Sequence, residues 1–381
     1  MTVHIIGLMS GTSLDGIDAA LVRFDGEPGM LDWELEAFRS APYDAARRAR
    51  IHDAIEKGSA ASLCRLHADL GEWFAGAALA LCRNANVRTG DIAAIGSHGQ
   101  TVWHEPPAGG RRGATLQLGC ASTIAERTGI TVVSDFRARD VAAGGHGAPL
   151  VPFADRMLFA LPGRVRVLIN IGGMANLTRV PERGSGEPLL AFDTGPGNAL
   201  IDAAVERATA GRESFDRDGA RARAGRADDA LLAQLLEDTF FAEPPPRSTG
   251  REHFSRAMVD GIIARRHPQD DADWADLIAT LTALTAHSIA DAVRRFVLPR
   301  GADEVVVTGG GASNTALMEA LAAALAPLTV KAGHAAGIDP DAKEAIAFAA
   351  LAWAHLMQWP GNAPEVTGSA GPRVLGSRTP A

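Results

Sequence analysis

The sequence predicts an α/β protein built from two similar units. Hydrophobic residues make up 46% of the 381 residues but aromatic residues only 5%, so the core is expected to be mainly aliphatic. Two segments, 3–24 and 165–180, each show an apolar run, a turn rich in Gly and polar residues, and a second apolar run, which is the pattern of a hairpin. Because each hairpin opens a unit, the pattern indicates an internal duplication.

The first unit begins with hairpin strands over 3–9 and 17–24. Apolar residues then recur at three- and four-residue steps, which is typical of helices, and Asp44 and Ser59 can cap them. The elements expected after the hairpin are helices over 44–57 and 59–84, a strand over 92–97, a helix over 122–128 and a strand over 131–134. Loop residues become frequent over 135–149 and mark a predicted domain boundary.

The second unit is predicted to begin with hairpin strands over 165–171 and 177–180. The charged, interrupted segment 211–253 is expected to be a surface insertion or a linking element. The other predicted elements are strands over 189–192 and 304–308 and helices over 199–210, 272–296, 315–325 and 341–357. The Gly- and Pro-rich tail after Pro360 is expected to lie on the surface.

Charge and composition exclude several classes of function. Acidic residues outnumber basic ones, 45 to 37, which argues against a nucleic-acid or anionic-membrane binder. No signal peptide or apolar span is recognisable, so a cytoplasmic protein with three reduced cysteines is expected. Lys57, Lys331 and Lys343 are not followed by Ser or Thr, which excludes a P-loop. A dinucleotide site at Gly309 is only weakly indicated.

Four glycine-rich corners each follow an apolar strand, at 10–16, 172–176, 193–198 and 309–311. Strand ends of this kind gather at one edge of an α/β sheet, where ligands bind. Backbone N–H groups at such turns can cradle a phosphate group. A single corner is weak evidence, because glycines in turns are usually structural. Four in one chain predict a phosphate-binding function.

Polar residues beside these corners are candidates for chemistry. Asp193 follows a buried strand and could take a proton from a hydroxyl or water, although it could equally cap the helix after it. Residues 97–100 and 135–140 offer donors that suit an acidic, hydroxyl-rich ligand such as a sugar acid, and a salt-bridged loop is the alternative. His146 could bind a ligand or only tolerate its turn, and Glu344 could be a solvated helix residue.

Seven stretches resemble the anhydro-N-acetylmuramic acid kinases. They are GLMSGTSLDGID at 7–18, GSHGQT at 96–101, DFRARD at 135–140, NIGGMAN at 170–176, FDTGPGN at 192–198, STGRE at 248–252 and GGG at 309–311. They follow one another over nearly the whole chain, so the resemblance is specific to this family. It implies two duplicated ribonuclease-H-like lobes, as in actin, Hsp70 and sugar kinases, with an interdomain cleft. The lobes would span 1–134, completed by 341–381, and 135–340.

The resemblance also implies the site residues. Asp193 would be the catalytic base. Those expected to hold the nucleotide are Met9, Ser10, Gly11, Thr12, Ser13, Leu14, Asp15, Gly16, Gly172, Gly173, Gly309, Gly310 and Gly311. Those expected to hold the sugar are Ser97, His98, Gly99, Gln100, Arg137, Asp140, His146 and Glu344, with Arg137 (then Arg139) for its carboxylate. Many superfamily members carry an aspartate where this chain has Met9 or Ser10, so Mg²⁺ is expected at Asp15 or Asp18 through water.

The implied reaction uses ATP and belongs to cell-wall sugar recycling. Water opens the 1,6-anhydro bridge of the amino sugar at C1, and O6 receives the γ-phosphoryl group, which gives N-acetylmuramic acid 6-phosphate and ADP. A homodimer is also implied. Two alternatives stay open at this point: a kinase for another hexose or amino sugar, and a non-catalytic ATP-gated protein like actin or Hsp70.

Overall fold

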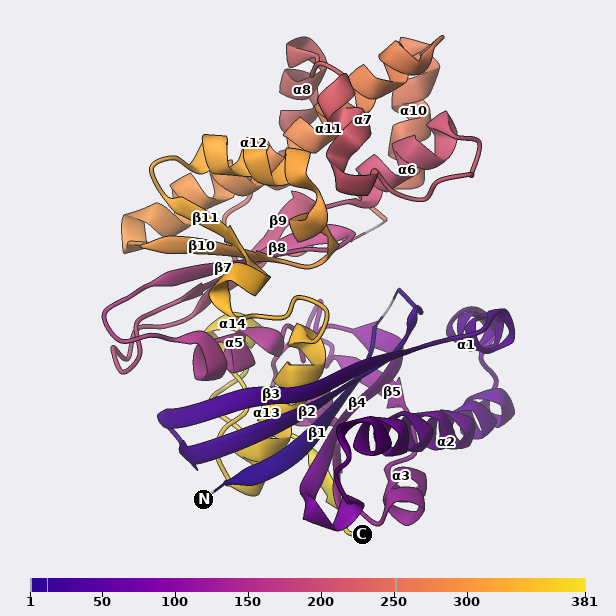
Figure 1. The fold of residues 1–381 in the computed structure, drawn as a ribbon, viewed down its shortest axis with the longest axis vertical. Coiled ribbons are helices and arrows are strands. Elements are labelled where there is room, and N and C mark those ends of the chain that lie inside the picture. The colour runs from indigo at the N-terminus through magenta and orange to yellow at the C-terminus, as the bar shows by residue number, and fades with distance from the viewer. Residues whose placement is uncertain (1, 12, 251) are drawn as a thin grey trace. The chain divides into compact units, whose positions relative to one another are not determined.

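The computed structural model describes residues 2–11, 13–250 and 252–381. The chain forms two compact units, residues 1–159 with 342–381 (unit 1) and residues 160–341 (unit 2), which Figure 1 shows in the colours of the chain order. The chain therefore passes from one unit to the other twice. Within the described ranges, no helix has both the length and the apolar character that crossing a bilayer requires.

Unit 1 contains a seven-stranded sheet in the order β12-β6-β4-β1-β2-β3, with β5 paired to β4. The strands are β1 (Val3–Ser10), β2 (Gly16–Glu27), β3 (Met30–Pro42), β4 (Ile92–Glu105), β5 (Ala114–Leu118), β6 (Val132–Ser134) and β12 (Ser377–Thr379). β1, β2 and β3 are antiparallel neighbours, whereas β4 is parallel to β1 and β6 is parallel to β4. Because β1 and β4 run in the same direction, Ser10 at the end of β1 pairs with Gln100 within β4, and predicted site residues of the two strands lie side by side.

The two faces of this sheet are covered by different helices (Figure 1). Ile6 and Leu8 of β1 pack in a core with α1 (Ala45–Lys57), α2 (Ala60–Ala85) and α3 (Ala121–Thr128). Gly7 points to the opposite face, because side chains alternate along a strand. There α13 (Lys343–Leu356) lies so close that a Cβ on Gly7 or Gly96 would overlap one of its carbonyl oxygens. The C-terminal part of the chain is thus built into unit 1.

Unit 2 repeats the arrangement of unit 1. Its five-stranded sheet has the order β11-β10-β7-β8-β9. The strands are β7 (Arg166–Ile171), β8 (Met174–Val180), β9 (Leu190–Pro196), β10 (Glu304–Thr308) and β11 (Thr329–Ala332). As in unit 1, three antiparallel strands are followed across the sheet by two strands parallel to the first. The shared order and directions confirm the predicted class of two duplicated ribonuclease-H-like α/β lobes.

Of the two predicted alternatives for segment 211–253, a surface insertion and a linking element, the structure contradicts the surface insertion. The segment contains the short helices α7 (Ala220–Ala224), α8 (Asp229–Leu236) and α9 (Thr239–Ala242). Leu231, Leu235, Phe240 and Phe241 are buried in a core shared with α6 (Ala199–Ala208), α10 (Arg256–Arg266) and α11 (Asp271–Ala292). Charged residues surround the short apolar runs at 230–236 and 240–242, and they concealed the burial of these runs in the sequence.

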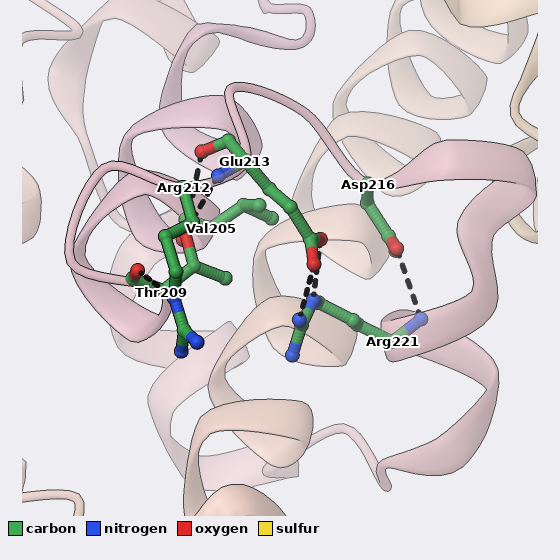
Figure 2. A network of polar contacts seen from close by, with 6 residues as sticks. All are labelled: Val205, Thr209, Arg212, Glu213, Asp216 and Arg221. Atoms are coloured by element: carbon green, nitrogen blue, oxygen red, sulfur yellow. Dashed lines mark hydrogen bonds and ion pairs between the residues drawn. The ribbon is translucent and has the colours of Figure 1, made fainter.

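The charged residues of this segment pair with one another near the end of α6, as Figure 2 shows. Thr209 Oγ1 donates to the Val205 carbonyl oxygen at 2.8 Å and accepts from the Glu213 N–H at 3.1 Å. Arg221 forms an ion pair with Glu213 at 3.0 Å, and its backbone N–H donates to Asp216 Oδ1 at 2.9 Å. The many charged residues in this part of the segment therefore form hydrogen bonds and ion pairs with near neighbours, and these contacts stabilise the connection between α6 and α7.

The structure divides the chain after Phe159 rather than after residue 134. The predicted loop over 135–149 contains α4 (Phe136–Ala142), and α5 (Val151–Phe159) follows it. Both helices pack in unit 1: the Phe136 ring lies 5.6 Å from the Phe348 ring of α13, and Asp155 forms a buried ion pair with Lys343 at 3.1 Å. The composition change at 135 therefore marks a connection within unit 1 and not the end of the unit.

Candidate active site

In unit 1 the turn between β1 and β2 is held by Ser10. Its Oγ lies 2.7 Å from Gln100 Oε1, 2.9 Å from the Tyr43 hydroxyl and 3.0 Å from the Gly16 carbonyl oxygen. Gln100 Nε2 also donates to the Gly11 carbonyl oxygen at 3.2 Å. Ser10 and Gln100 are 1% and 0% exposed. These two side chains therefore shape the turn from beneath, and they are not free to contact a ligand directly.

The other residues predicted for this turn differ in exposure. Met9 and Leu14 are buried, and Leu14 adopts a left-handed φ of 58°. Ser13 and Asp15 are exposed. Thr12 lies outside the described residues. The turn thus presents backbone groups and two exposed polar side chains, while its buried residues support it.

Beside this turn, His98 of β4 is paired with Arg137 of α4. Arg137 Nε and Nη2 donate to His98 Nε2 at 3.2 and 2.9 Å, and Arg137 Nη1 donates to the Gly147 carbonyl oxygen at 2.8 Å. Because Nε2 accepts, the proton must be on Nδ1, which lies 2.8 Å from the Gly99 carbonyl oxygen. Burial and the nearby guanidinium lower the pKa of His98 to about 3, so this histidine is neutral.

Arg137 keeps donors for a ligand. Burial lowers its pKa to about 10, against the opposing effect of Glu344, so the side chain remains charged at neutral pH. The contacts above use three of its five N–H groups, which leaves one on each terminal nitrogen. Glu344 and His146 are exposed. Ser97 is 1% exposed, and its Oγ has no hydrogen-bond partner in the described part of the chain.

Asp140 does not lie where a residue that binds the sugar is expected to lie. Its side chain is 0% exposed. Oδ2 accepts from the Gly147 N–H at 2.8 Å, and Oδ1 accepts from Asn362 Nδ2 at 2.7 Å and from Thr367 Oγ1 at 2.8 Å. A buried carboxylate with these partners cannot reach a ligand in this conformation. Asp140 instead joins the loop that contains Gly147 to the C-terminal segment.

In unit 2 the first candidate phosphate corner, Gly172 and Gly173, follows β7. Their carbonyl oxygens accept from the backbone N–H groups of Asn198 and Gly197 at 2.8 and 2.9 Å. A Cβ on Gly197 would overlap the Gly172 carbonyl oxygen, so the start of α6 is pressed against this corner. Thr285 Oγ1 of α11 donates to the Gly197 carbonyl oxygen at 2.8 Å and fixes the contact from behind.

The second corner, Gly309–Gly311, follows β10 and meets the first. A Cβ on Gly309 or Gly311 would overlap Ile171, and one on Gly310 would lie 3.6 Å from Asn198 Nδ2. Gly172, Gly173 and Gly309 are half-buried and Gly310 is exposed. The two predicted corners therefore lie at one edge, where their glycines contribute no side chains, as close approach of a phosphate or nucleoside requires.

Asp193 lies on β9, next to an irregularity in the sheet. It pairs with Asn176 of β8, while the next pair is Ala175 with Gly195, so Thr194 is an extra residue that forms a bulge. Asp193 Oδ2 accepts from the Thr249 N–H at 2.9 Å. The strand continues to Pro196, beyond the predicted end at 192.

The carboxylate of Asp193 is suited to take up a proton. Burial raises its pKa to about 6, while the Thr249 N–H and the positive charge of Arg247 oppose the rise. A base with this pKa is mostly ionised at neutral pH and still has appreciable proton affinity. The alternative role as a helix cap is not observed, because α6 begins after Asn198 without a side-chain capping bond.

The metal prediction is less strongly supported. Asp15 is exposed in the turn, and Asp18 is half-buried on β2 opposite Met9. Within the described ranges, no group of three or more His, Cys, Asp or Glu side chains is arranged to hold a metal ion. Any ion here would therefore need further ligands from a bound phosphate or from water.

Comparison with known proteins identifies the family. The family model described as anhydro-N-acetylmuramic acid kinase matches residues 3–381. This chain belongs to the anhydro-N-acetylmuramic acid kinase family. Membership confirms the predicted enzyme class, a kinase that uses ATP, and the predicted metabolism of amino sugars. It disfavours the alternative of a non-catalytic ATP-gated protein.

Relatives named anhydro-N-acetylmuramic acid kinase match over nearly their whole length. The protein from Gloeobacter violaceus is 47% identical over 380 residues, which cover 99% of this chain and 98% of that protein. The one from Caldanaerobacter subterraneus subsp. tengcongensis is 43% identical over 379 residues, 98% and 96% of the two chains. Among solved structures, an activator of 2-hydroxyisocaproyl-CoA dehydratase from Clostridium difficile gives a TM-score of 0.44 at 13% identity, over 90% of this chain and 91% of that chain.

In this member of the anhydro-N-acetylmuramic acid kinase family, three residues at the site were not predicted as site residues from the sequence. They are Tyr43 beneath the turn of unit 1, Asn198 between the corners of unit 2, and Arg247 beside Asp193. Tyr43 is the single tyrosine, and Asn198 closes the FDTGPGN stretch, so weak signals existed. Arg247 follows three prolines and gives no local sign of its contacts.

Proposed function

We propose that this chain converts 1,6-anhydro-N-acetylmuramic acid, ATP and water into N-acetylmuramic acid 6-phosphate and ADP. Water forms a new bond to C1, the bond between C1 and O6 breaks, and O6 takes the γ-phosphoryl group. The full-length match to the family carries this proposal. The position and raised pKa of Asp193 supply a mechanism for it.

Asp193 is the proposed base that accepts a proton from the attacking water. A general base of this kind contributes about a hundredfold to ten-thousandfold to the rate. Its pKa of about 6 predicts that activity falls as the pH drops through that value, because the protonated carboxyl cannot accept the proton. The hydrogen bond from the Thr249 N–H to Oδ2 leaves Oδ1 as the oxygen available to water.

The glycine edge of unit 2 and the β1–β2 turn of unit 1 are the proposed nucleotide contacts. Gly172, Gly173 and Gly309 are half-buried and Gly310 is exposed, so a phosphate or a nucleoside can approach the backbone there, whereas Gly311 is buried beneath them. Mg²⁺ in such enzymes keeps several waters and takes one or two carboxylates besides substrate phosphates, so exposed Asp15 and half-buried Asp18 fit as ligands. When bound, the ion would neutralise charge on the phosphates.

Arg137 is the proposed partner of the sugar's lactyl carboxylate, because it retains a positive charge and two unused N–H groups. Arg137→Ala should raise the KM for the sugar more than the KM for ATP. Equal KM values for the variant and the wild type would argue against this assignment. Arg139, the second choice from the sequence, is exposed and lies two residues after Arg137 in α4.

The decisive experiment compares Asp193→Asn with Asp260→Asn. The first variant should lose at least about a hundredfold in turnover while ATP still binds. The control changes a carboxylate that pairs with Arg207 on the surface of the same unit, and it should keep wild-type turnover. Near wild-type turnover in Asp193→Asn would refute the role of this residue.

Product analysis tests the reaction itself. Mass spectrometry should show that the anhydro-sugar gains one water and one phosphate, with release of one ADP. A panel of hexoses and amino sugars with a free 6-hydroxyl separates this reading from an ordinary sugar kinase, because those sugars should not be consumed. The homodimer remains a prediction, and light scattering of the purified protein would test it.

A further inference from the structure

The segment before Thr249 is joined to the Asp193 strand by two hydrogen bonds, one between backbone groups and one from the Arg247 side chain. The Asp193 N–H donates to the Arg247 carbonyl oxygen at 3.1 Å, and Arg247 Nε donates to the Asp193 carbonyl oxygen at 3.0 Å. Two residues further on, the Thr249 N–H reaches the Asp193 carboxylate itself. Asp193 is therefore held at its N–H, its carbonyl and its side chain by the same short segment.

Arg247 is itself anchored in an unusual environment. It is 8% exposed, and its guanidinium carbon lies 4.7, 5.4 and 5.6 Å from the ring centres of Phe240, Phe192 and Phe296. Its Nη1 donates to the carbonyl oxygens of Phe240, Phe241 and Glu243, at 3.0, 3.1 and 2.7 Å. A planar, charged fork that stacks on rings and binds several carbonyls has its orientation strongly determined.

We infer that Arg247 is a positioning residue for the base of this reaction: it fixes the backbone of Asp193 and places a permanent positive charge near its carboxylate. The inference rests on the proposed role of Asp193 in proton transfer. No ion pair links Arg247 to Asp193, so the arginine acts through orientation and through its field. Its three backbone acceptors at 240–243 and the phenylalanine rings keep it beside the strand.

The charges around Arg247 determine how large its effect on Asp193 can be. Burial is the main cause that lowers the pKa of Arg247. Arg295, just beyond the end of α11, lowers it too, whereas Asp291 and Glu243 raise it, and the group remains a cation at neutral pH. At Asp193 the positive charge of Arg247 opposes the effect of burial on the pKa. Removal of this charge should therefore raise the pKa of Asp193 further above its ordinary value.

Arg247→Met tests the inference, because methionine preserves apolar packing but has neither the charge nor the donors. The acidic limb of kcat/KM for the sugar should move to higher pH, since this limb reports the free enzyme's base. Turnover should fall by up to about a hundredfold, because a small misplacement of a reacting group can cost that much. The KM for ATP should change little.

Arg247→Lys separates the effect of the positive charge from the effect of the several hydrogen bonds that a guanidinium group can form. Lysine keeps the positive charge, so the acidic limb should return toward its wild-type position. Its single ammonium group cannot bond the Asp193 carbonyl and the carbonyls at 240–243 together, so turnover should stay reduced. If Arg247→Met fails to fold, the pH profile and turnover of Arg247→Lys still test whether Arg247 positions Asp193.

The matched control is Arg295→Met. Arg295 also donates to the Phe241 carbonyl oxygen, at 2.8 Å, and lies over the Phe296 ring, but no contact joins it to Asp193. It should keep the wild-type pH profile. A purely structural role for Arg247 would lower the melting temperature and leave the acidic limb where it is, and that result would overturn the inference. An active Asp193→Asn would instead refute the proposed base, whatever the Arg247 variants do.

Discussion

Asp140→Asn tests whether the loop that supports Arg137 depends on a buried carboxylate. The substitution keeps the shape of the side chain but replaces one oxygen with an NH₂ group. If the amide oxygen keeps Asn362 and Thr367, its nitrogen must face the Gly147 N–H, and two donors then oppose each other. If the amide is turned the other way, its oxygen accepts from the Gly147 N–H and the hydrogen bonds from Asn362 and Thr367 are lost instead. At least one buried donor loses its acceptor in either case.

The expected cost follows from these contacts. A hydrogen bond to a charged group is worth about 1.5–3 kcal/mol, and the remaining two bonds weaken when the charge is lost. The sum is about 3–5 kcal/mol, a large share of the roughly 5–15 kcal/mol by which native proteins are stable. Because the Gly147 carbonyl accepts from Arg137, loss of its tether should also displace the guanidinium. A loss of one hydrogen bond to the sugar would raise its KM roughly tenfold.

Two assays check this prediction. Urea unfolding followed by tryptophan fluorescence should show the lost stability, and initial rates should show a raised KM for the sugar with an unchanged KM for ATP. Asp91→Asn is the control in the same unit, because Asp91 pairs with Arg88 on the surface and should unfold like the wild type. If Asp140→Asn matches the wild type in both assays, Asp140 does not hold this loop.

Three further predictions concern unit 1. Tyr43→Phe removes the hydroxyl that bonds to Ser10 and should raise the KM for ATP roughly 2- to 10-fold in steady-state assays; an unchanged KM would exclude this support of the turn. Gly7→Ala places a methyl group against a carbonyl oxygen of α13 and should cost about 1–3 kcal/mol or more in thermal melts, whereas wild-type stability would contradict the close packing. Lys343→Met removes the buried counter-ion of Asp155 and should cost about 3–5 kcal/mol, and adding Asp155→Leu should restore part of it if the loss comes from the buried charge.

The hairpins and the glycine corners were predictable because their causes are local. An apolar run followed by Gly and polar residues forms a strand and a turn in almost any context. Parallel neighbours such as β7 and β10 then bring their corners to one edge, as the positions of Gly172 and Gly309 show. The order of the motifs along the chain was also sufficient to predict the family.

Local pattern could not distinguish a ligand contact from a structural one. Asp140 and Arg137 stand three residues apart in one motif, yet Asp140 is buried among protein donors while Arg137 keeps two unused N–H groups. Asn362, which bonds Asp140, lies 222 residues further along the chain. The role of each residue was decided by partners that the motif does not contain.

From the sequence alone, two hairpin-led α/β lobes, glycine-rich turns after the strands and the family could be predicted, since each follows from neighbouring residues or from motif order. Only the tertiary structure decided that α4 and α5 belong to the first lobe, that Tyr43 supports its turn, and that Arg247 holds Asp193. These outcomes depend on which buried polar groups meet across long stretches of chain. A buried donor or acceptor without a hydrogen-bond partner costs folding free energy, so the folded chain pairs such groups with one another. The partners often lie far apart in the sequence, and the spacing of residues within a motif does not identify them.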